Sequence, residues 1–124
     1  MPLTALVVDD SMLIRHTVCR FLETRGFHVE SATNGSEALE MLGTLRPDII
    51  VTDLQMPKMD GSALIKALQS RPETAAIPVV VLAGRQSTDQ ELETRARYVI
   101  FKDIDIVSQL SRALESVLPS GTTA

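Results

Sequence analysis

The stretch of residues 5–11, ALVVDDS, decides the fold because it joins an apolar run to two adjacent aspartates. A short, continuous apolar run is typical of a strand that is buried on both faces. Asp9 and Asp10 then put two carboxylates where that strand leaves the core. In an open parallel sheet, ligands bind beyond the carboxyl ends of the strands. The stretch therefore predicts both a central strand and the rim of a site.

The rest of the chain alternates strand patterns with helical spacing. Further strands are predicted at residues 28–32, 48–52, 79–82 and 99–101. Helices are predicted after Ser11, which can cap one, and up to Gly26; around residues 38–42 and 63–68; and over 106–117. Asp103 or Asp105 is the expected cap of the last helix. Five βα units follow, which predicts an α/β fold with a doubly wound five-stranded parallel sheet flanked by helices.

Two segments depart from this regular pattern. The stretch TDQELETRAR, residues 88–97, has almost no apolar stripe, so the fourth helix is expected to be short or irregular, around residues 88–95. The end of the chain, PSGTTA, is expected to be a flexible tail or linker over residues 119–124. A single domain over residues 1–118 is expected to precede it.

Composition excludes several classes of protein. The net charge is −4, with three Phe, one Tyr and no Trp, and no basic cluster, which argues against a nucleic-acid surface. No apolar run approaches the roughly 18 residues that cross a bilayer, and the start lacks a signal-peptide pattern, so no membrane partner and a cytoplasmic location are expected. Cys19 is expected to be a small core residue, and His16 and His28 surface or satisfied residues.

The candidate site is a group of acids at one edge of the sheet. Asp53 follows the apolar run of residues 49–52, as Asp9 and Asp10 follow theirs. If the two strands are neighbours, three carboxylates meet and repel one another unless a positive group lies between them. Carboxylate and carbonyl oxygens suit a hard ion such as Mg²⁺, and Lys102, after the fifth strand, could reach the same place.

Four motifs resemble the receiver domain of two-component response regulators, of the chemotaxis-regulator type, over the whole chain. They are VVDDS at residues 7–11, DLQMPKMDG at 53–61, PVVVLAG at 78–84, and the lysine Lys102 at the end of the fifth strand. The resemblance implies the strand order 2-1-3-4-5. It also implies a phosphohistidine donor on a sensor histidine kinase or histidine phosphotransfer protein, and an unknown downstream protein partner.

The resemblance also implies roles for the site residues. Asp53 is implied as the phosphoryl acceptor. Asp10 and Asp53, with the backbone carbonyl of Gln55, are implied as Mg²⁺ ligands, and Asp9 as a ligand that acts directly or through water. Lys102 is implied to bind the phosphoryl oxygens.

Three positions differ from the family pattern. Ala83 stands where the family has Thr or Ser, and Val99 where it has Tyr or Phe, so both residues of the usual switch are missing. Asp103 replaces the usual proline after Lys102. A non-proline cis bond costs about 2.5 to 4 kcal/mol, so a trans bond is predicted there.

Three other functions stay open. A degenerate receiver that binds partners without phosphorylation is favoured by Ala83 and Val99 but opposed by the intact acids and Lys102. A Mg²⁺-dependent phosphatase with an aspartyl nucleophile is less consistent, because its Asp-x-Asp pattern is absent after the first strand. A flavin binder is the weakest, since no phosphate loop follows that strand. The resemblance implies a phosphoryl acceptor that catalyses its own phosphotransfer and dephosphorylation, and not a conventional turnover enzyme.

Overall fold

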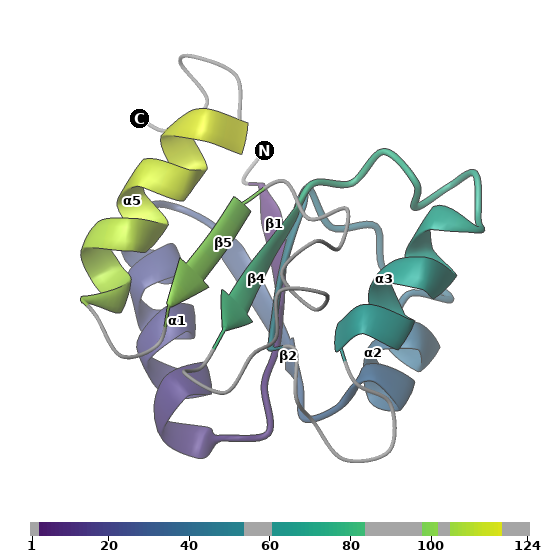
Figure 1. Cartoon of the computed structure of the whole chain (residues 1–124), viewed down its shortest axis with the longest axis horizontal. Coiled ribbons are helices and arrows are strands. Elements are labelled where there is room, and N and C mark those ends of the chain that lie inside the picture. The colour runs from purple at the N-terminus through teal and green to yellow at the C-terminus, as the bar shows by residue number, and fades with distance from the viewer. Residues whose placement is uncertain (1–2, 54–60, 84–97, 102–104, 118–124) are drawn as a thin grey trace.

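A computed structural model describes residues 3–53, 61–83, 98–101 and 105–117 of the chain. Its centre is one sheet of parallel strands in the order β2-β1-β3-β4-β5, which confirms the predicted fold class and order (Figure 1). The strands are β1 (Thr4–Val8), β2 (His28–Ala32), β3 (Ile49–Asp53), β4 (Val79–Ala83) and β5 (Tyr98–Phe101).

Helices cover both faces of this sheet. One side carries α1 (Met12–Thr24) and α5 (Ile106–Val117), and the other carries α2 (Gly35–Met41) and α3 (Gly61–Gln69) (Figure 1). The segment expected to hold a fourth helix, residues 88–95, lies outside the described residues, as do the Lys102–Asp103 bond and the tail from 119 to 124. Among the helices described, none has the length and apolar content needed to cross a membrane.

Alternating side chains of the same strands supply two cores. Ala5 and Val7 face α1 and α5, whereas Leu6 and Val8 face α2 and α3, and all four are fully buried. Because successive side chains of a strand point to opposite faces, a strand covered on both sides must be apolar at every position. This explains the continuous apolar runs of the sequence.

The starts of α1 and α5 use capping residues that the sequence predicts. Ser11 Oγ accepts a hydrogen bond from the Ile14 N–H (3.3 Å) at the start of α1. Asp105 is the cap of α5: its carboxylate accepts hydrogen bonds from the Ser108 N–H (3.2 Å) and hydroxyl (2.8 Å), which lower the pKa of Asp105. The N-cap of α2, Asn34, accepts from the Glu37 N–H (2.8 Å) and was not predicted, although Asn three residues before Glu fits a capping pattern.

The end of α1 depends on Gly26. This glycine has φ +88°, and its N–H donates to the Glu23 carbonyl (3.1 Å) while the Phe27 N–H donates to the Leu22 carbonyl (3.1 Å). The two bonds form a Schellman motif, which turns the chain so that Phe27 packs into the same core as Leu22. Gly26 therefore sets the direction in which β2 begins.

We predict that Gly26→Ala lowers the free energy of unfolding by about 1 to 2 kcal/mol. A Cβ at this position would meet no atom within 4 Å, so the loss comes from the positive φ alone. Gly26→Asn is the matched control and should lose less, because Asn tolerates this region better. Urea unfolding measures both, and equal stability of native protein and the alanine variant would contradict the assignment.

Candidate functional site

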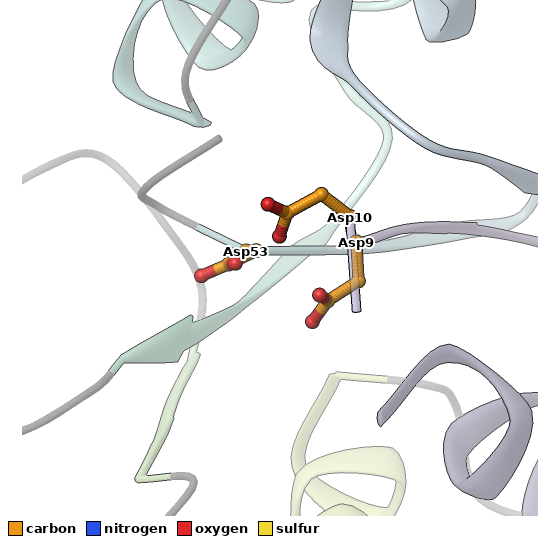
Figure 2. A group of neighbouring side chains, drawn as sticks. All are labelled: Asp9, Asp10 and Asp53. Carbon is orange, nitrogen blue, oxygen red and sulfur yellow. The ribbon is translucent and has the colours of Figure 1, made fainter. Parts of the chain in front are cut away.

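Parallel pairing of β1 with β3 brings three aspartates together. Val8 pairs with Thr52, so both strands end at the same level of the sheet. Asp9 and Asp10 follow β1, and Asp53 is the last residue of β3. One carboxylate oxygen from each lies within 4.8 Å of the others, and Figure 2 shows the three side chains leaving these strand ends as one group. We call Asp9, Asp10 and Asp53 the acidic cluster.

Burial differs sharply among the three members of the acidic cluster. Asp9 is fully buried and Asp53 is 5% exposed, whereas Asp10 is exposed to solvent. The sheet ladder continues past β1, because the Asp9 N–H donates to the Ala32 carbonyl at 3.1 Å. Asp9 is therefore held as firmly as a strand residue, and the acidic cluster reaches from the core to the surface.

Hydrogen bonds fix the backbone around the acidic cluster. The Asp9 carboxylate accepts from the Ser11 N–H (2.8 Å), and the Asp9 carbonyl accepts from Nη1 of Arg15 (2.9 Å). The Thr52 hydroxyl donates to the Asp53 carbonyl (3.0 Å). Sequence reasoning missed the contact of Arg15, which follows from its place one turn into α1, where its side chain can reach back to the strand end.

The donor set of the acidic cluster fits a hard divalent cation. Three carboxylates this close repel one another, and a cation between them removes that repulsion. All three offer oxygen, and no imidazole or thiolate belongs to the acidic cluster, which favours Mg²⁺ over Zn²⁺. The expectation that Asp9, Asp10 and Asp53 meet at one place is confirmed by this geometry.

The other predicted site residues have different outcomes. Gln55 and Lys102 lie outside the described residues. Ala83 ends β4 in register with Phe101 of β5. Val99 pairs with Val81 and packs, partly buried, against the core on the α2 and α3 side.

The histidines and the cysteine lie away from the acidic cluster. His16 is exposed, and His28 is exposed and contacts the Glu30 carboxylate at 2.7 Å. Cys19 is partly buried against the core under α1, and that burial raises the pKa of its thiol. The predictions of surface or satisfied histidines and of a packed cysteine hold for all three.

Comparison with known proteins identifies the class. The response regulator receiver domain model matches residues 5–115. The response regulator MprA of Mycolicibacterium vanbaalenii is 37% identical over 92 residues, which cover 74% of this chain and 39% of that protein. The matched region is thus about two fifths of the length of such curated relatives.

Solved structures agree with this class. A receiver domain of a signal transduction histidine kinase from Syntrophus aciditrophicus is 33% identical, with a TM-score of 0.82 over 93% of this chain and 89% of the other. Chemotaxis response regulator CheY4 of Vibrio cholerae is 30% identical, with a TM-score of 0.84 over 95% of this chain and 100% of the other. The receiver domain of the Pseudomonas aeruginosa sensor kinase PA1611 shares the fold at 18% identity, with a TM-score of 0.83 over 94% and 98% of the two chains, and was solved with magnesium in its active-site cleft.

The sheet order and the acidic cluster at the carboxyl ends of its strands agree with this family match. The chain belongs to the response regulator receiver domain family of two-component systems.

We predict that Asp10→Asn raises the free energy of unfolding of the metal-free protein by about 1 kcal/mol at low ionic strength, because it removes one member of a repelling group. Added MgCl₂ should stabilise the native protein and should stabilise the variant less at the same concentration. Urea unfolding with and without MgCl₂ measures both effects.

Glu73→Gln is the matched control, because Glu73 is an exposed carboxylate outside the acidic cluster. Its response to MgCl₂ should equal that of the native protein. An equal gain of native stability from NaCl at the same ionic strength would show screening in place of a bound cation.

Proposed function

We propose that this domain accepts a phosphoryl group on Asp53 from the phosphohistidine of a sensor histidine kinase or a histidine phosphotransfer protein. The observation that carries the proposal is the acidic cluster, with one oxygen of each carboxylate within 4.8 Å of the others. Membership of the receiver family and the DLQMPKMDG motif that begins at Asp53 support it.

The proposal gives each residue a role. Asp10, Asp53 and the backbone carbonyl of Gln55 hold Mg²⁺, and Asp9 joins them directly or through water. A cation held by these residues would supply charge neutralisation for the oxygens of the transferring group. Lys102 binds those oxygens as a second positive charge. Support comes from the all-oxygen donor set and, by analogy, from the magnesium in the PA1611 receiver domain.

The transfer is a simple displacement at phosphorus. A carboxylate oxygen of Asp53 attacks the phosphorus, the bond from phosphorus to the imidazole nitrogen breaks, and the imidazole leaves as a neutral ring after it takes a proton. The domain supplies position and charge neutralisation for this displacement. The 5% exposure of Asp53 leaves it reachable while the surrounding backbone holds its direction.

We propose that phosphorylation changes the conformation of this domain by another route than in receivers that have the usual switch residues. A hydrogen bond to a charged group contributes roughly 1.5 to 3 kcal/mol, and Ala83 has no hydroxyl to make one. A shift from 1:99 to 99:1 between two states needs about 5.5 kcal/mol, so this loss removes a large part of the coupling. Val99 is a β-branched side chain with restricted χ1, and it cannot swing as an aromatic ring does.

We propose α1 as the route by which the signal leaves. The first turns of α1 are joined to the acidic cluster twice, through the Ser11 N–H on the Asp9 carboxylate and through Arg15 on the Asp9 carbonyl. A phosphoryl group on Asp53 changes the charge beside both contacts. The segment at residues 88–95 is the second proposed route.

A second candidate function is a phosphorylation-independent interaction module. Ala83 and Val99 favour it, because a receiver without its switch residues can bind a partner in one constant state.

We also propose that residues 1–118 form the receiver domain and that residues 119–124 form a tail or linker. We propose that the protein is cytoplasmic and that it acts on a downstream protein that is not yet identified.

We predict that incubation with acetyl phosphate and MgCl₂ adds one phosphoryl group to the native protein, measured by intact mass. Asp53→Asn should show no gain, and Glu73→Gln should gain as the native protein does. Removal of Mg²⁺ with EDTA should abolish the reaction, because the phosphoryl charge then meets the bare carboxylates. An equal gain in Asp53→Asn would rule out this acceptor, and no gain in native protein even with a histidine kinase would favour the interaction module.

We predict that Ala83→Thr strengthens the response to phosphorylation. The restored hydroxyl should add the missing charged hydrogen bond, which corresponds to roughly a ten- to hundredfold larger shift in the equilibrium between two states. Amide NMR spectra before and after phosphorylation measure it. In the native protein we expect phosphorylation to change the amide chemical shifts of α1. If only the acidic cluster showed changes, the proposed switch would be ruled out.

A further inference from the structure

The outer edge of β2 carries backbone groups without a sheet partner among the described residues. β2 is the first strand in the sheet order, so only β1 pairs with it. The His28 N–H donates to the Leu3 carbonyl (2.8 Å), and the Ala32 carbonyl accepts from the Asp9 N–H (3.1 Å). Because backbone groups alternate sides along a parallel strand, those of Val29 and Ser31 point away from β1.

An open groove of about 360 Å³ lies along this same edge. Val29 and Ser31 line it from β2, and Met12, Arg15, Cys19 and Arg20 line it from α1. The α1 residues recur at helical spacing, so they form one stripe that faces the strand edge. The two strand residues with outward backbone groups are thus the ones that border the groove.

The groove is positive, although the chain has a net charge of −4. Its two arginines, Arg15 and Arg20, outnumber Glu23, the one carboxylate that lines it, and His16 adds an imidazole. Arg15 uses Nη1 on the Asp9 carbonyl, whereas Arg20 is exposed and makes no ion pair with any residue that the structure describes. Outward N–H and C=O groups beside arginines suit an extended acidic segment.

We propose that β2 receives an extended acidic peptide from a partner protein as an additional edge strand, with the acidic side chains on the α1 side of the sheet. The N–H and C=O groups of Val29 and Ser31 bond the peptide backbone. Arg20 and Arg15 contact its carboxylates, and the apolar parts of Met12 and Cys19 contact the stems of the same side chains. None of the three aspartates of the acidic cluster lines this groove, and the proposal does not depend on phosphorylation.

A second copy of this chain fits the edge less well. Antiparallel pairing that uses both Val29 and Ser31 places Val29 of one copy opposite Ser31 of the other. Glu30 then stands directly opposite Glu30, and like charges directly opposite destabilise a strand pair. This repulsion disfavours a second copy, and the arginines of the groove favour a different chain of acidic composition.

The test is an amide NMR titration with a short capped peptide that alternates Thr and Glu. We expect the largest shifts at Val29, Ser31 and the α1 stripe, with weaker binding as salt rises. A matched peptide with Lys in place of Glu should not bind. Equal binding of both peptides, or shifts centred away from β2, would overturn the proposal.

Variants of Val29 and Arg20 distinguish hydrogen bonding to the peptide backbone from electrostatic attraction to its carboxylates. Val29→Pro removes the outward N–H and leaves the donors that face β1, so we expect roughly a three- to tenfold weaker affinity. Val29→Thr keeps the N–H and should bind as the native protein does. Arg20→Gln should weaken binding about threefold at low salt.

Two controls make every outcome decisive. Urea unfolding and the amide spectrum show whether Val29→Pro is folded; if it is not, Ser31→Pro tests the same prediction at the neighbouring outward N–H. Sedimentation measures whether the native protein forms a dimer through this edge. A dimer that is lost in Val29→Pro would show self-association at β2 and would overturn the proposal of a peptide partner. Unchanged affinity in a folded proline variant would also overturn it.

Discussion

The in-register pairing of β1 with β3 is the constraint on which the site depends. It pairs Val8 with Thr52 and so brings Asp9, Asp10 and Asp53 together. One carboxylate oxygen of each lies within 4.8 Å of the others, despite their mutual repulsion. The opposing stabilisation comes from strands buried on both faces, whose side chains cannot leave the two cores without exposing apolar area. The sheet therefore holds together a group of charges that would separate in a flexible loop.

Helix α1 connects the acidic cluster to the far edge of the sheet. Its first turns are tied to Asp9 through Ser11 and Arg15, and its next turns line the groove beside β2. Arg15 belongs to both sets, because one of its nitrogens bonds the Asp9 carbonyl while the residue lines the groove. A movement of α1 would therefore change contacts both at the acidic cluster and in the groove.

Local sequence patterns were sufficient for the described helices and strands and for the members of the acidic cluster. They were not sufficient for the contacts that depend on strand order. Apolar runs located all five strands within a residue or so, and the end of β3 differs because Asp53 is still paired in the sheet, with Leu82. The order 2-1-3-4-5 came from resemblance alone. Without it nothing makes β2 an edge, so the groove was not predicted, and the contact of Arg15 needed the angle between α1 and β1.

The packing of the fold explains the residue at Val99 but does not explain the acidic cluster. Val99 suits its place, because a β-branched side chain fits a strand beside Val81 and packs against the core on the α2 and α3 side. The acidic cluster has no such explanation, since a fully buried Asp9 beside Asp53 opposes stability. The Asp9 carboxylate does accept the Ser11 N–H just before α1, but that contact needs one carboxylate and not three. The excess of charge therefore supports the proposed cation and the proposed chemistry on Asp53, whereas Val99 is explained by its packing in β5.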